Sequence, residues 1–256
     1  MIELGKEKRQ IIRHMCSEAD SVLPRGAAEG RMGRVWVPES GNPSFCLIQL
    51  GNFAYLFGIC PKGEPSMELK EQLLLQFSHG FITPSDVRWA QWVEETFAGQ
   101  FRIVSRYAMR KDRNHFSETA LKEYTKISSP GLRIEKMDKK LYQLAFQEEW
   151  SRDFCSNFDS AEDFLKNGLG FAVLDGDSLV SGCTACGISE GMIFVKVATR
   201  KEYRRRGLAL ACSASLILSC LEQGINPGWD ADNIPSAGLA EKLGYIFEKE
   251  YQVYEL

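Results

Sequence analysis

Short runs rich in apolar and β-branched residues recur through the second half of the chain, and turn signals separate them. The Asp175–Gly176–Asp177 and Glu190–Gly191 stretches have the composition of tight turns between antiparallel strands. We therefore expect a strand over residues 132–137, followed later by a three-stranded meander over 171–174, 179–188 and 192–199. A short strand ending at Trp229–Asp230 and a β segment over 245–255 complete this set.

Helical spacing of apolar residues fills the intervals between these strands. Asp138 stands as an N-cap before a helical pattern that extends to about Asn157, and Ser160 opens a capping box for a short helix ending near Asn167. Two further helices are expected over 207–221 and 235–243. The predicted order of the second half is β-α-α-β-β-β-α-β-α-β, a mixed α/β (α+β) arrangement.

The first half also reads as mixed α/β, with no catalytic motif. Strands are expected over 34–37, 45–50, 53–59 and 101–109, and helices over 67–78, 85–97 and 117–124. The Ser128–Ser129–Pro130–Gly131 stretch is a linker signal. We therefore expect two domains: an N-terminal α/β lobe over 1–128 and a second domain over 129–256.

Composition and charge exclude several classes of partner. The net charge is −3, so no global field attracts nucleic acid or an anionic membrane. The most apolar stretch, from Gly207 to Leu221, contains three serines and is shorter than the roughly 20 residues that cross a bilayer. The first ten residues have no apolar h-region, so we expect no signal peptide.

The eight cysteines indicate reduced thiols and a cytoplasmic location rather than a disulfide framework. Cys183 and Cys186 form a CxxC spacing, but they fall in an expected strand, where residues three apart point to opposite faces. We interpret them as small packing residues. The three histidines have no ligand spacing, and no metal site is expected.

The stretch Arg204–Arg205–Arg206–Gly207–Leu208–Ala209 joins the expected strand over 192–199 to the apolar helix. The first N–H groups of a helix, together with the positive end of its dipole, form an anion site. Gly207 would let the backbone approach a phosphate closely, and the arginines can add charge-assisted hydrogen bonds. The alternative is an ordinary solvated run of arginines.

Residues 203–209, together with the Asn233–x–x–Ser236 and Glu241–Lys242–Leu243–Gly244–Tyr245 stretches, resemble the GCN5-related N-acetyltransferase (GNAT) superfamily. The element order over 132–256 agrees with the GNAT fold, a mixed and splayed central sheet flanked by helices. The additional N-terminal lobe, which could be a degenerate GNAT-like lobe, is similar to the subfamily that includes zwittermicin A resistance acetyltransferases. The Trp229–Asp230–x–x–Asn233 stretch also supports that resemblance.

The resemblance implies a reaction and a site. The chain would move an acetyl group from acetyl-CoA to a primary amine of a small molecule, by direct attack of the amine on the thioester. The backbone around Val197, Ala198 and Thr199 would hold the pantetheine arm and supply the oxyanion donor. The backbone N–H groups of Arg205, Arg206, Gly207, Leu208 and Ala209 would hold the pyrophosphate, and Arg204 would occupy the Arg/Gln position of the same cofactor-binding motif. Asn233 and Ser236 would lie on the other side of the cofactor, near the pantetheine or the sulfur.

Two positions depart from the family pattern and leave the acid and base open. Ala240 occupies the position where many members carry the tyrosine that protonates the leaving thiolate, so Ser236 is the candidate acid, or the thiolate leaves without one. The central strand carries Lys196 instead of a carboxylate. Asp230 is the candidate base, with an ordinary loop acid as the equal alternative, and Asp232 and Glu190 are more distant candidates.

Two functions of different class fit these observations. The first is the N-acetyltransferase described above, with no nucleic-acid or membrane partner and one cofactor site per chain, the first lobe forming a wall of the acceptor pocket. The second is a catalytically inactive lobe that binds acetyl-CoA as a sensor or a partner-binding module. The sequence names neither the amine acceptor nor the oligomeric state.

Overall fold

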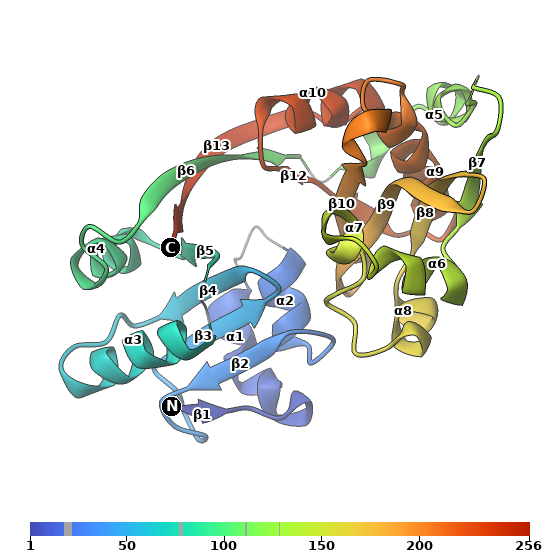
Figure 1. The fold of residues 1–256 in the computed structure, drawn as a ribbon. Coiled ribbons are helices and arrows are strands. Elements are labelled where there is room, and N and C mark those ends of the chain that lie inside the picture. The colour runs from blue at the N-terminus through green and yellow to red at the C-terminus, as the bar shows by residue number, and fades with distance from the viewer. Residues whose placement is uncertain (18–21, 77–78, 111, 128) are drawn as a thin grey trace. The chain divides into compact units, whose positions relative to one another are not determined.

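The computed structural model describes residues 1–17, 22–76, 79–110, 112–127 and 129–256. The chain divides into two compact units, of which unit 1 contains Met1–Arg106 and Glu250–Leu256, and unit 2 contains Tyr107–Lys249. The contacts thus place the chain from Tyr107 to Lys249 in unit 2 and return the last residues to unit 1. The linker signal instead places the boundary at Ser128, which lies outside the described residues. Each unit contains both strands and helices (Figure 1).

A five-stranded sheet organises unit 2. Its order is β11 (Asn226–Gly228), β10 (Met192–Thr199), β9 (Ser178–Ser189), β8 (Gly170–Asp175) and β7 (Leu132–Lys136). Strands β7 to β10 are antiparallel, whereas β10 and β11 are parallel because α9 (Leu208–Glu222) crosses between them. The predicted meander is confirmed, and its bounds differ from the prediction by one residue at most.

Helices cover both faces of this sheet (Figure 1). The apolar helix α9 contacts β8, β9 and β10 on one face and α5 (Glu118–Tyr124) on its outer side, so it is buried almost all round. On the other face, α6 (Lys139–Ala145) contacts β9, and α7 (Glu149–Arg152) contacts β10. Helix α8 (Ala161–Asn167) packs on α6, and Ser160 caps it by accepting from the Asp163 N–H, as the capping box predicts.

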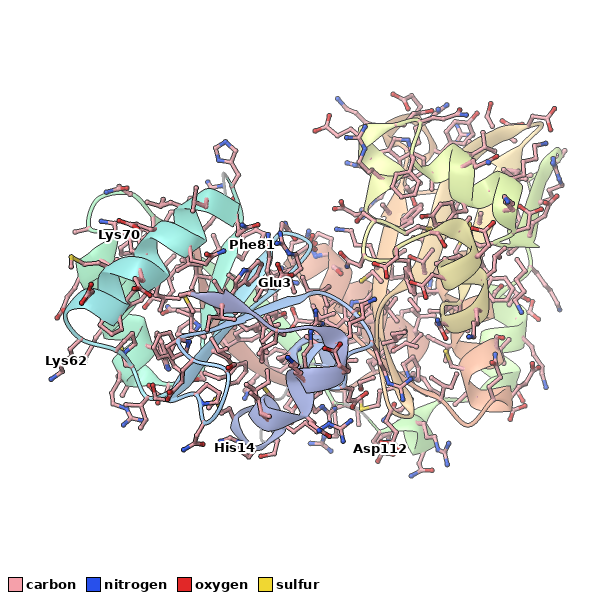
Figure 2. All side chains as sticks on the ribbon, turned by 90° about the horizontal axis from the view of Figure 1, so that it is seen from below. Glu3, His14, Lys62, Lys70, Phe81 and Asp112 are labelled. Carbon is pink, nitrogen blue, oxygen red and sulfur yellow. The ribbon has the colours of Figure 1, made fainter. Side chains whose placement is uncertain are left out.

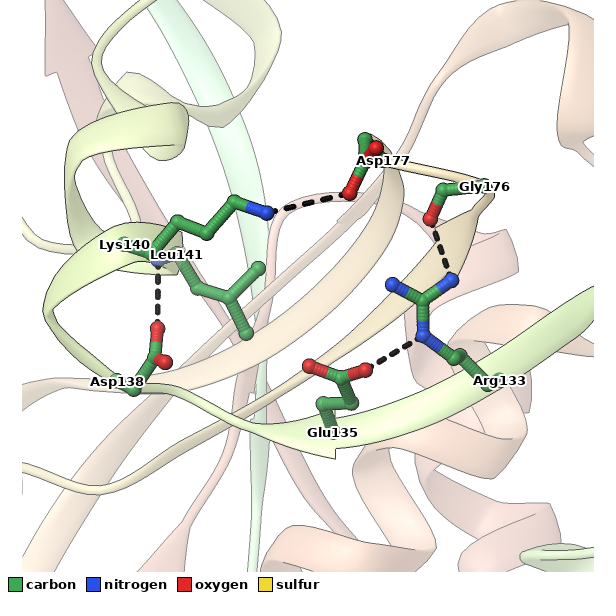
Figure 3. Close-up of polar contacts among 7 residues, drawn as sticks. All are labelled: Arg133, Glu135, Asp138, Lys140, Leu141, Gly176 and Asp177. Atoms are coloured by element: carbon green, nitrogen blue, oxygen red, sulfur yellow. Dashed lines mark hydrogen bonds and ion pairs between the residues drawn. The ribbon is translucent and has the colours of Figure 1, made fainter.

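The single helix expected from Asp138 to Asn157 is wrong: the structure has two short helices there. Asp138 does cap α6, accepting the Leu141 N–H at 2.8 Å (Figure 3). The helix then ends after Ala145, because Glu148 takes an extended conformation with φ −128° and ψ 145°. In that conformation Glu148 pairs with Arg200, 52 residues later, a contact that local periodicity does not encode.

The strand expected to end at Trp229–Asp230 is also two elements. Strand β11 pairs with β10, and β12 (Asp230–Ala231) pairs with the end of β6 (Arg102–Met109). The remaining elements of unit 2 are η2 (Arg113–His115), η3 (Lys201–Tyr203), α10 (Ile234–Leu243) and the start of β13 (Phe247–Glu255). Helix α10 has the predicted C-terminus and begins one residue earlier than predicted.

Unit 1 repeats the order of elements found in unit 2. Strands β2 (Arg34–Val37), β3 (Phe45–Leu50) and β4 (Phe53–Gly58) form an antiparallel meander. The three strands were predicted, and only the last ends one residue earlier than expected. Helix α3 (Glu64–Gln76) leads to β5 (Phe81–Pro84), which is parallel to β4, and α4 (Val87–Thr96) comes next. The order in unit 1 is therefore a meander, a helix, a parallel strand and a second helix. Unit 2 has the same order from β8 to α10, so unit 1 has a GNAT-like topology.

Several elements of unit 1 were not predicted or start elsewhere. No pattern in the sequence marks β1 (Ile2–Glu3), η1 (Lys6–Ile12), α1 (Arg13–Cys16), α2 (Val22–Ala28) or β5, which are short or contain proline. Helix α3 begins three residues before the expected Met67, because Gly63 with φ +62° turns the chain and Pro65 fits the first helical turn. Its expected end, Ser78, lies outside the described residues.

Candidate acetyl-CoA site

Strands β10 and β11 separate after three paired residues. Met192, Ile193 and Phe194 pair with Asn226, Pro227 and Gly228. A bulge between Phe194 and Val195 then interrupts the β9–β10 register, and the chain after β11 crosses to β6 as β12. Within the described residues, Val195–Thr199 therefore has β9 on one side and no paired strand on the other. This is the splay expected of the fold.

The hydrogen-bond pattern identifies which residues face the open edge. The Arg200 N–H donates to the Val180 carbonyl at 2.9 Å, so Arg200 is a hydrogen-bonded position of the antiparallel pair. Because such positions alternate, Ala198 also bonds towards β9, whereas the N–H and C=O groups of Val197 and Thr199 point to the open edge. Residues 196–199 are half-buried although their strand lies inside the sheet.

The loop after β10 ends at an uncapped helix. Gly207 is the N-cap of α9 with φ 78° and ψ 2°, and no side chain caps the helix. The N–H groups of Leu208 and Ala209 therefore point out of the helix end, with no partner among the residues the structure describes. A Cβ built on Gly207 meets nothing within 4 Å, so the space in front of the loop is open.

The three arginines of the loop have different surroundings. Arg204 donates from Nε to the Thr199 carbonyl at 3.2 Å, which closes the loop onto the end of β10. Arg206 lies over the Tyr203 ring at 5.0 Å, and the Tyr203 hydroxyl donates to Asp175 at 2.8 Å. Arg205 has φ 65°, in the left-handed region that non-glycine residues rarely adopt. The guanidinium groups of Arg204 and Arg206 are thus held by neighbouring residues, whereas Arg205 is marked by its backbone conformation.

Asn233 and Ser236 have structural contacts of their own. Asn233 is the N-cap of α10, and its Oδ1 accepts the Ser236 N–H at 2.9 Å. The Ser236 hydroxyl accepts from the Trp229 indole at 3.3 Å, and Trp229 is buried against Tyr245 with ring centroids 5.5 Å apart. The candidate acid is therefore already held in place by a buried aromatic residue.

The candidate acid and base positions differ in burial. Asp230 is half-buried in β12 at the point where the strands diverge, and its neighbours Trp229 and Ala231 point to the opposite, buried side. Asp232 and Glu190 are exposed. Ala240 is fully buried in α10, and burial raises the pKa of Tyr245, whose ring packs between Trp229 and Phe116. Tyr245 is a packing residue.

The cysteines near the site are unsuited to nucleophilic catalysis. Cys183 and Cys186 lie buried in β9 as free thiols, in keeping with their interpretation as packing residues. Burial raises the pKa of the Cys183 thiol well above its usual value and that of Cys212 to about 12. Both thiols are therefore protonated at neutral pH, and a protonated thiol is a poor nucleophile.

The wedge of unit 1, the place where β4 extends beyond its last pair with β5 at Leu56 and Pro84, is occupied by the indole of Trp89. The Trp89 indole donates to the Gly58 carbonyl at 3.0 Å, and Trp89 is completely buried. Gly63 precedes α3 with φ +62°, as Gly207 precedes α9, but Glu64 and Pro65 come after it. An acidic residue opposes an anion, and proline removes an N–H donor. Lys62 extends from this loop into solvent (Figure 2).

Sequence reasoning missed three charged residues around the site: Glu148, Asp153 and Arg200. Arg200 pairs with Glu148, and Lys196 lies 3.3 Å from Asp153. The two acids flank α7, more than 40 residues away from their partners along the chain, so no motif joins them. Only the packing of α7 on β10 brings these charges together.

The splayed sheet with an uncapped helix after β10 defines a GNAT-type fold. The family model described as GNAT acetyltransferase matches residues 13–254, and the chain belongs to this family. A GCN5-related N-acetyltransferase-like protein from Streptococcus suis 89/1591 is 31% identical, with a TM-score of 0.87 over 98% of this chain and 99% of that one.

Two further relatives extend the comparison. The uncharacterized N-acetyltransferase YdfB of Bacillus subtilis (strain 168) is 34% identical over 128 residues, which is 48% of this chain and 48% of that protein, so the match spans about half of the relative. A tandem GNAT protein from the clavulanic acid biosynthesis pathway has a TM-score of 0.62 over 100% of this chain and 97% of that chain at 9% identity. The latter likeness concerns the fold alone, and it agrees with two GNAT-like lobes.

The comparisons support an acyltransferase of the GNAT type. Among the residues that the structure describes, no helix is long and apolar enough to cross a membrane.

Proposed function

We propose that the protein is an N-acetyltransferase that transfers the acetyl group of acetyl-CoA to a primary amine of a small molecule. The observation that carries this proposal is the open edge of β10, followed after η3 and the arginine loop by the uncapped N-terminus of α9. A pantetheine amide can bond to an unpaired strand edge, and a pyrophosphate can bond to free N–H groups at a helix end. In this proposal one acetyl-CoA molecule occupies both sites, with its pantetheine arm on the strand edge and its pyrophosphate at the helix end.

Each residue has a task in this proposal. Val197 and Thr199 bond the pantetheine through their backbone, and the backbone from Arg204 to Ala209 holds the pyrophosphate. Of the two candidate oxyanion donors, the Val197 N–H faces the open edge and the Ala198 N–H faces β9, so we assign this task to Val197. Asn233 and Ser236 lie on the α10 side of the cofactor.

Acetyl-CoA supplies the activated thioester carbonyl. The acceptor ammonium loses one proton to water, and the amine lone pair attacks the carbonyl carbon. The C–N bond forms, the C–S bond breaks, and the thiolate leaves with its electron pair. A second proton leaves the nitrogen and the thiolate is protonated, so one ammonium and one thioester give one amide, one thiol and one proton. In this scheme most of the rate acceleration comes from holding the amine and the thioester in position for attack. Asp230 and Ser236 are the candidate base and acid.

The test is a substitution at Gly207. Gly207→Asp places a carboxylate against the diphosphate, and we expect acetyl-CoA affinity to fall on the order of 100-fold, about 2.7 kcal/mol. Gly207→Asn is the matched control, because asparagine has the same shape, tolerates a positive φ and carries no charge. Isothermal titration with acetyl-CoA measures both, and circular dichroism checks the fold.

Arg205→Ala is expected to weaken acetyl-CoA binding much less than Gly207→Asp, because Arg205 contributes its N–H group and its side chain is exposed. Equal losses in the two variants would support the alternative of a solvated charge run whose side chains alone attract the ligand.

A second function is favoured by one observation. Ala240 is completely buried where a tyrosine acid would stand, and the described part of β10 carries no carboxylate. A lobe without acid and base could bind acetyl-CoA as a sensor or a partner-binding module. Incubating the protein with acetyl-CoA and a set of primary amines separates the two functions: release of free thiol supports the enzyme, whereas binding without thiol release supports the sensor. A cytoplasmic location and a small-molecule partner remain parts of the proposal.

A further inference from the structure

Alternate residues of β10 face opposite sides of the sheet, and the contacts identify the sides. Lys196 stands opposite Thr184, whose hydroxyl donates to the Phe154 carbonyl at 2.7 Å, so the even-numbered residues face the α7 side. Thr199 lies 2.7 Å from Ser181 through their hydroxyl oxygens, and Ser181 contacts Cys212 of α9. The charged side chains of Lys196 and Arg200 therefore lie on the α7 side of the strand.

Each of these two cations has an acidic partner at one end of α7. Lys196 Nζ is 3.3 Å from Asp153 Oδ2, and Arg200 pairs with Glu148 Oε1. Two unpaired cations on the strand beside the proposed thioester would repel a positively charged acceptor amine. The two carboxylates cancel that repulsion, so the α7 face of β10 is electrostatically compatible with an ammonium group.

Glu148 and Asp153 differ in how many of their carboxylate oxygens are already engaged. Both oxygens of Glu148 are engaged, Oε1 by Arg200 and Oε2 by the Trp150 indole at 2.8 Å. Asp153 uses Oδ2 for Lys196, and within the described residues its Oδ1 has no partner. The Asp153 side chain is 58% exposed, so this oxygen can be reached from solvent. Of the two, only Asp153 has a carboxylate oxygen available to a ligand.

We propose that Asp153 binds the ammonium group of the acceptor through Oδ1, and that Lys196 orients it by holding Oδ2. This inference rests on the proposed acetyl transfer. It places the acceptor nitrogen on the α7 face of β10, beside Val197, whose N–H points to the open edge. Asp153 is a binding residue in this assignment, and it accounts for amine recognition beside a strand, β10, that carries a lysine and no carboxylate.

The experiment compares Asp153→Asn with the wild-type protein in thiol-release assays with acetyl-CoA and four primary amines: ethanolamine, putrescine, glucosamine and lysine. For any amine that the wild type acetylates, we expect the KM of the amine to rise by about 10- to 100-fold in Asp153→Asn, because the variant loses one charge-assisted hydrogen bond to the ammonium group. The KM of acetyl-CoA and kcat should stay within about twofold, since asparagine keeps the shape of the side chain. Asp153→Glu should recover most of the amine affinity.

Asp177→Asn is the matched control. Asp177 also pairs with a lysine of the same unit, with 3.2 Å between Lys140 Nζ and Asp177 Oδ1, and both side chains are exposed (Figure 3). This variant should leave both KM values unchanged. An amine KM that is unchanged in Asp153→Asn, or raised equally in Asp177→Asn, overturns the inference, as does an equal rise in the KM of acetyl-CoA.

Calorimetry with acetyl-CoA alone separates this inference from the proposed function. A wild-type protein that does not bind acetyl-CoA overturns the proposed function itself. A protein that binds acetyl-CoA and acetylates none of the four amines overturns the role of Asp153 and leaves the cofactor site standing.

Discussion

At the scale of single residues, Asn233 shows how one side chain can serve both the fold and the ligand. Its Oδ1 accepts the Ser236 N–H at 2.9 Å and so caps α10, which leaves its amide nitrogen as a donor on an exposed residue. The family resemblance assigns Asn233 to the cofactor, whereas the structure explains it as a cap. Substitutions can separate these tasks.

Asn233→Asp keeps the capping oxygen and removes the amide donor. We expect the free energy of unfolding to stay within about 0.5 kcal/mol and acetyl-CoA affinity to fall, whereas Asn233→Ala should lose affinity and also about 1 kcal/mol of stability. Urea denaturation and calorimetry measure the two quantities. Unchanged acetyl-CoA affinity in Asn233→Asp would show that Asn233 acts only as the cap.

The residues of the site were predictable from the sequence to different degrees. Gly207 and the loop around it were identifiable because the loop is contiguous and its glycine and helix signal stand side by side. Asp153 was not, because its relation to Lys196 is made by the packing of α7 on β10 and leaves no spacing in the sequence. Ser236 was a candidate from the family pattern and remains a prediction, and its bond to the Trp229 indole leaves no signal in the sequence.

At the scale of elements, those that depend on local sequence signals were predictable, and those that depend on contacts between distant residues were not. The meander from β8 to β10 was predictable because each strand is bounded by a glycine-containing turn in the adjacent sequence. The break between α6 and α7 depends on Glu148 reaching Arg200, and the division into β11 and β12 depends on β6. These contacts join residues far apart in the chain, so helical or strand periodicity carries no trace of them.

Trp89 gives an element-scale prediction about the filled wedge of unit 1. Trp89→Phe removes the indole donor from the Gly58 carbonyl, and an unpaired buried carbonyl costs about 1–3 kcal/mol. We expect the urea midpoint to fall accordingly, with acetyl-CoA affinity unchanged. The midpoint is measured by circular dichroism, because the substitution removes a tryptophan and so changes the fluorescence signal irrespective of stability.

Trp92→Phe is the control for this substitution. Its indole donates to the Ser66 hydroxyl at 2.7 Å, and a half-buried hydroxyl can turn to another partner. The Trp92 variant should therefore be the less destabilised of the two. If Trp89→Phe alters acetyl-CoA affinity, the wedge of unit 1 takes part in binding and its assignment as filled is wrong.

At the scale of the whole molecule, two units with one succession of elements differ in the segment after the third strand of their meanders, β10 in unit 2 and β4 in unit 1. In unit 2 the strand edge is open and the helix end is uncapped, whereas in unit 1 an indole occupies the edge, and an acid and a proline begin the helix. The meanders of both units were foreseeable from the strand pattern, whereas the parallel strand β5 of unit 1 was not. The filling of one wedge was not, because Trp89 reaches Gly58 only in the folded unit.

We expect one acetyl-CoA per chain. Titration calorimetry should give a stoichiometry of one for the wild type, and in Gly207→Asp this single binding event should weaken on the order of 100-fold. Two binding events per chain, or a binding event that keeps the wild-type affinity in Gly207→Asp, would place a cofactor in unit 1.

The indole of Trp89 has a consequence for how each unit responds to ligand. A unit whose gap is closed by its own side chain is as stable without acetyl-CoA as with it, whereas a unit with an open gap gains stability from whatever fills it. At a ligand concentration of 100 times Kd, that gain is about 2.7 kcal/mol. Amide hydrogen exchange should therefore slow on adding acetyl-CoA in β10 and α9 and stay unchanged in β4 and α3. Unit 1 would then have the same stability with and without ligand, whereas unit 2 would reach its full stability only while acetyl-CoA is bound.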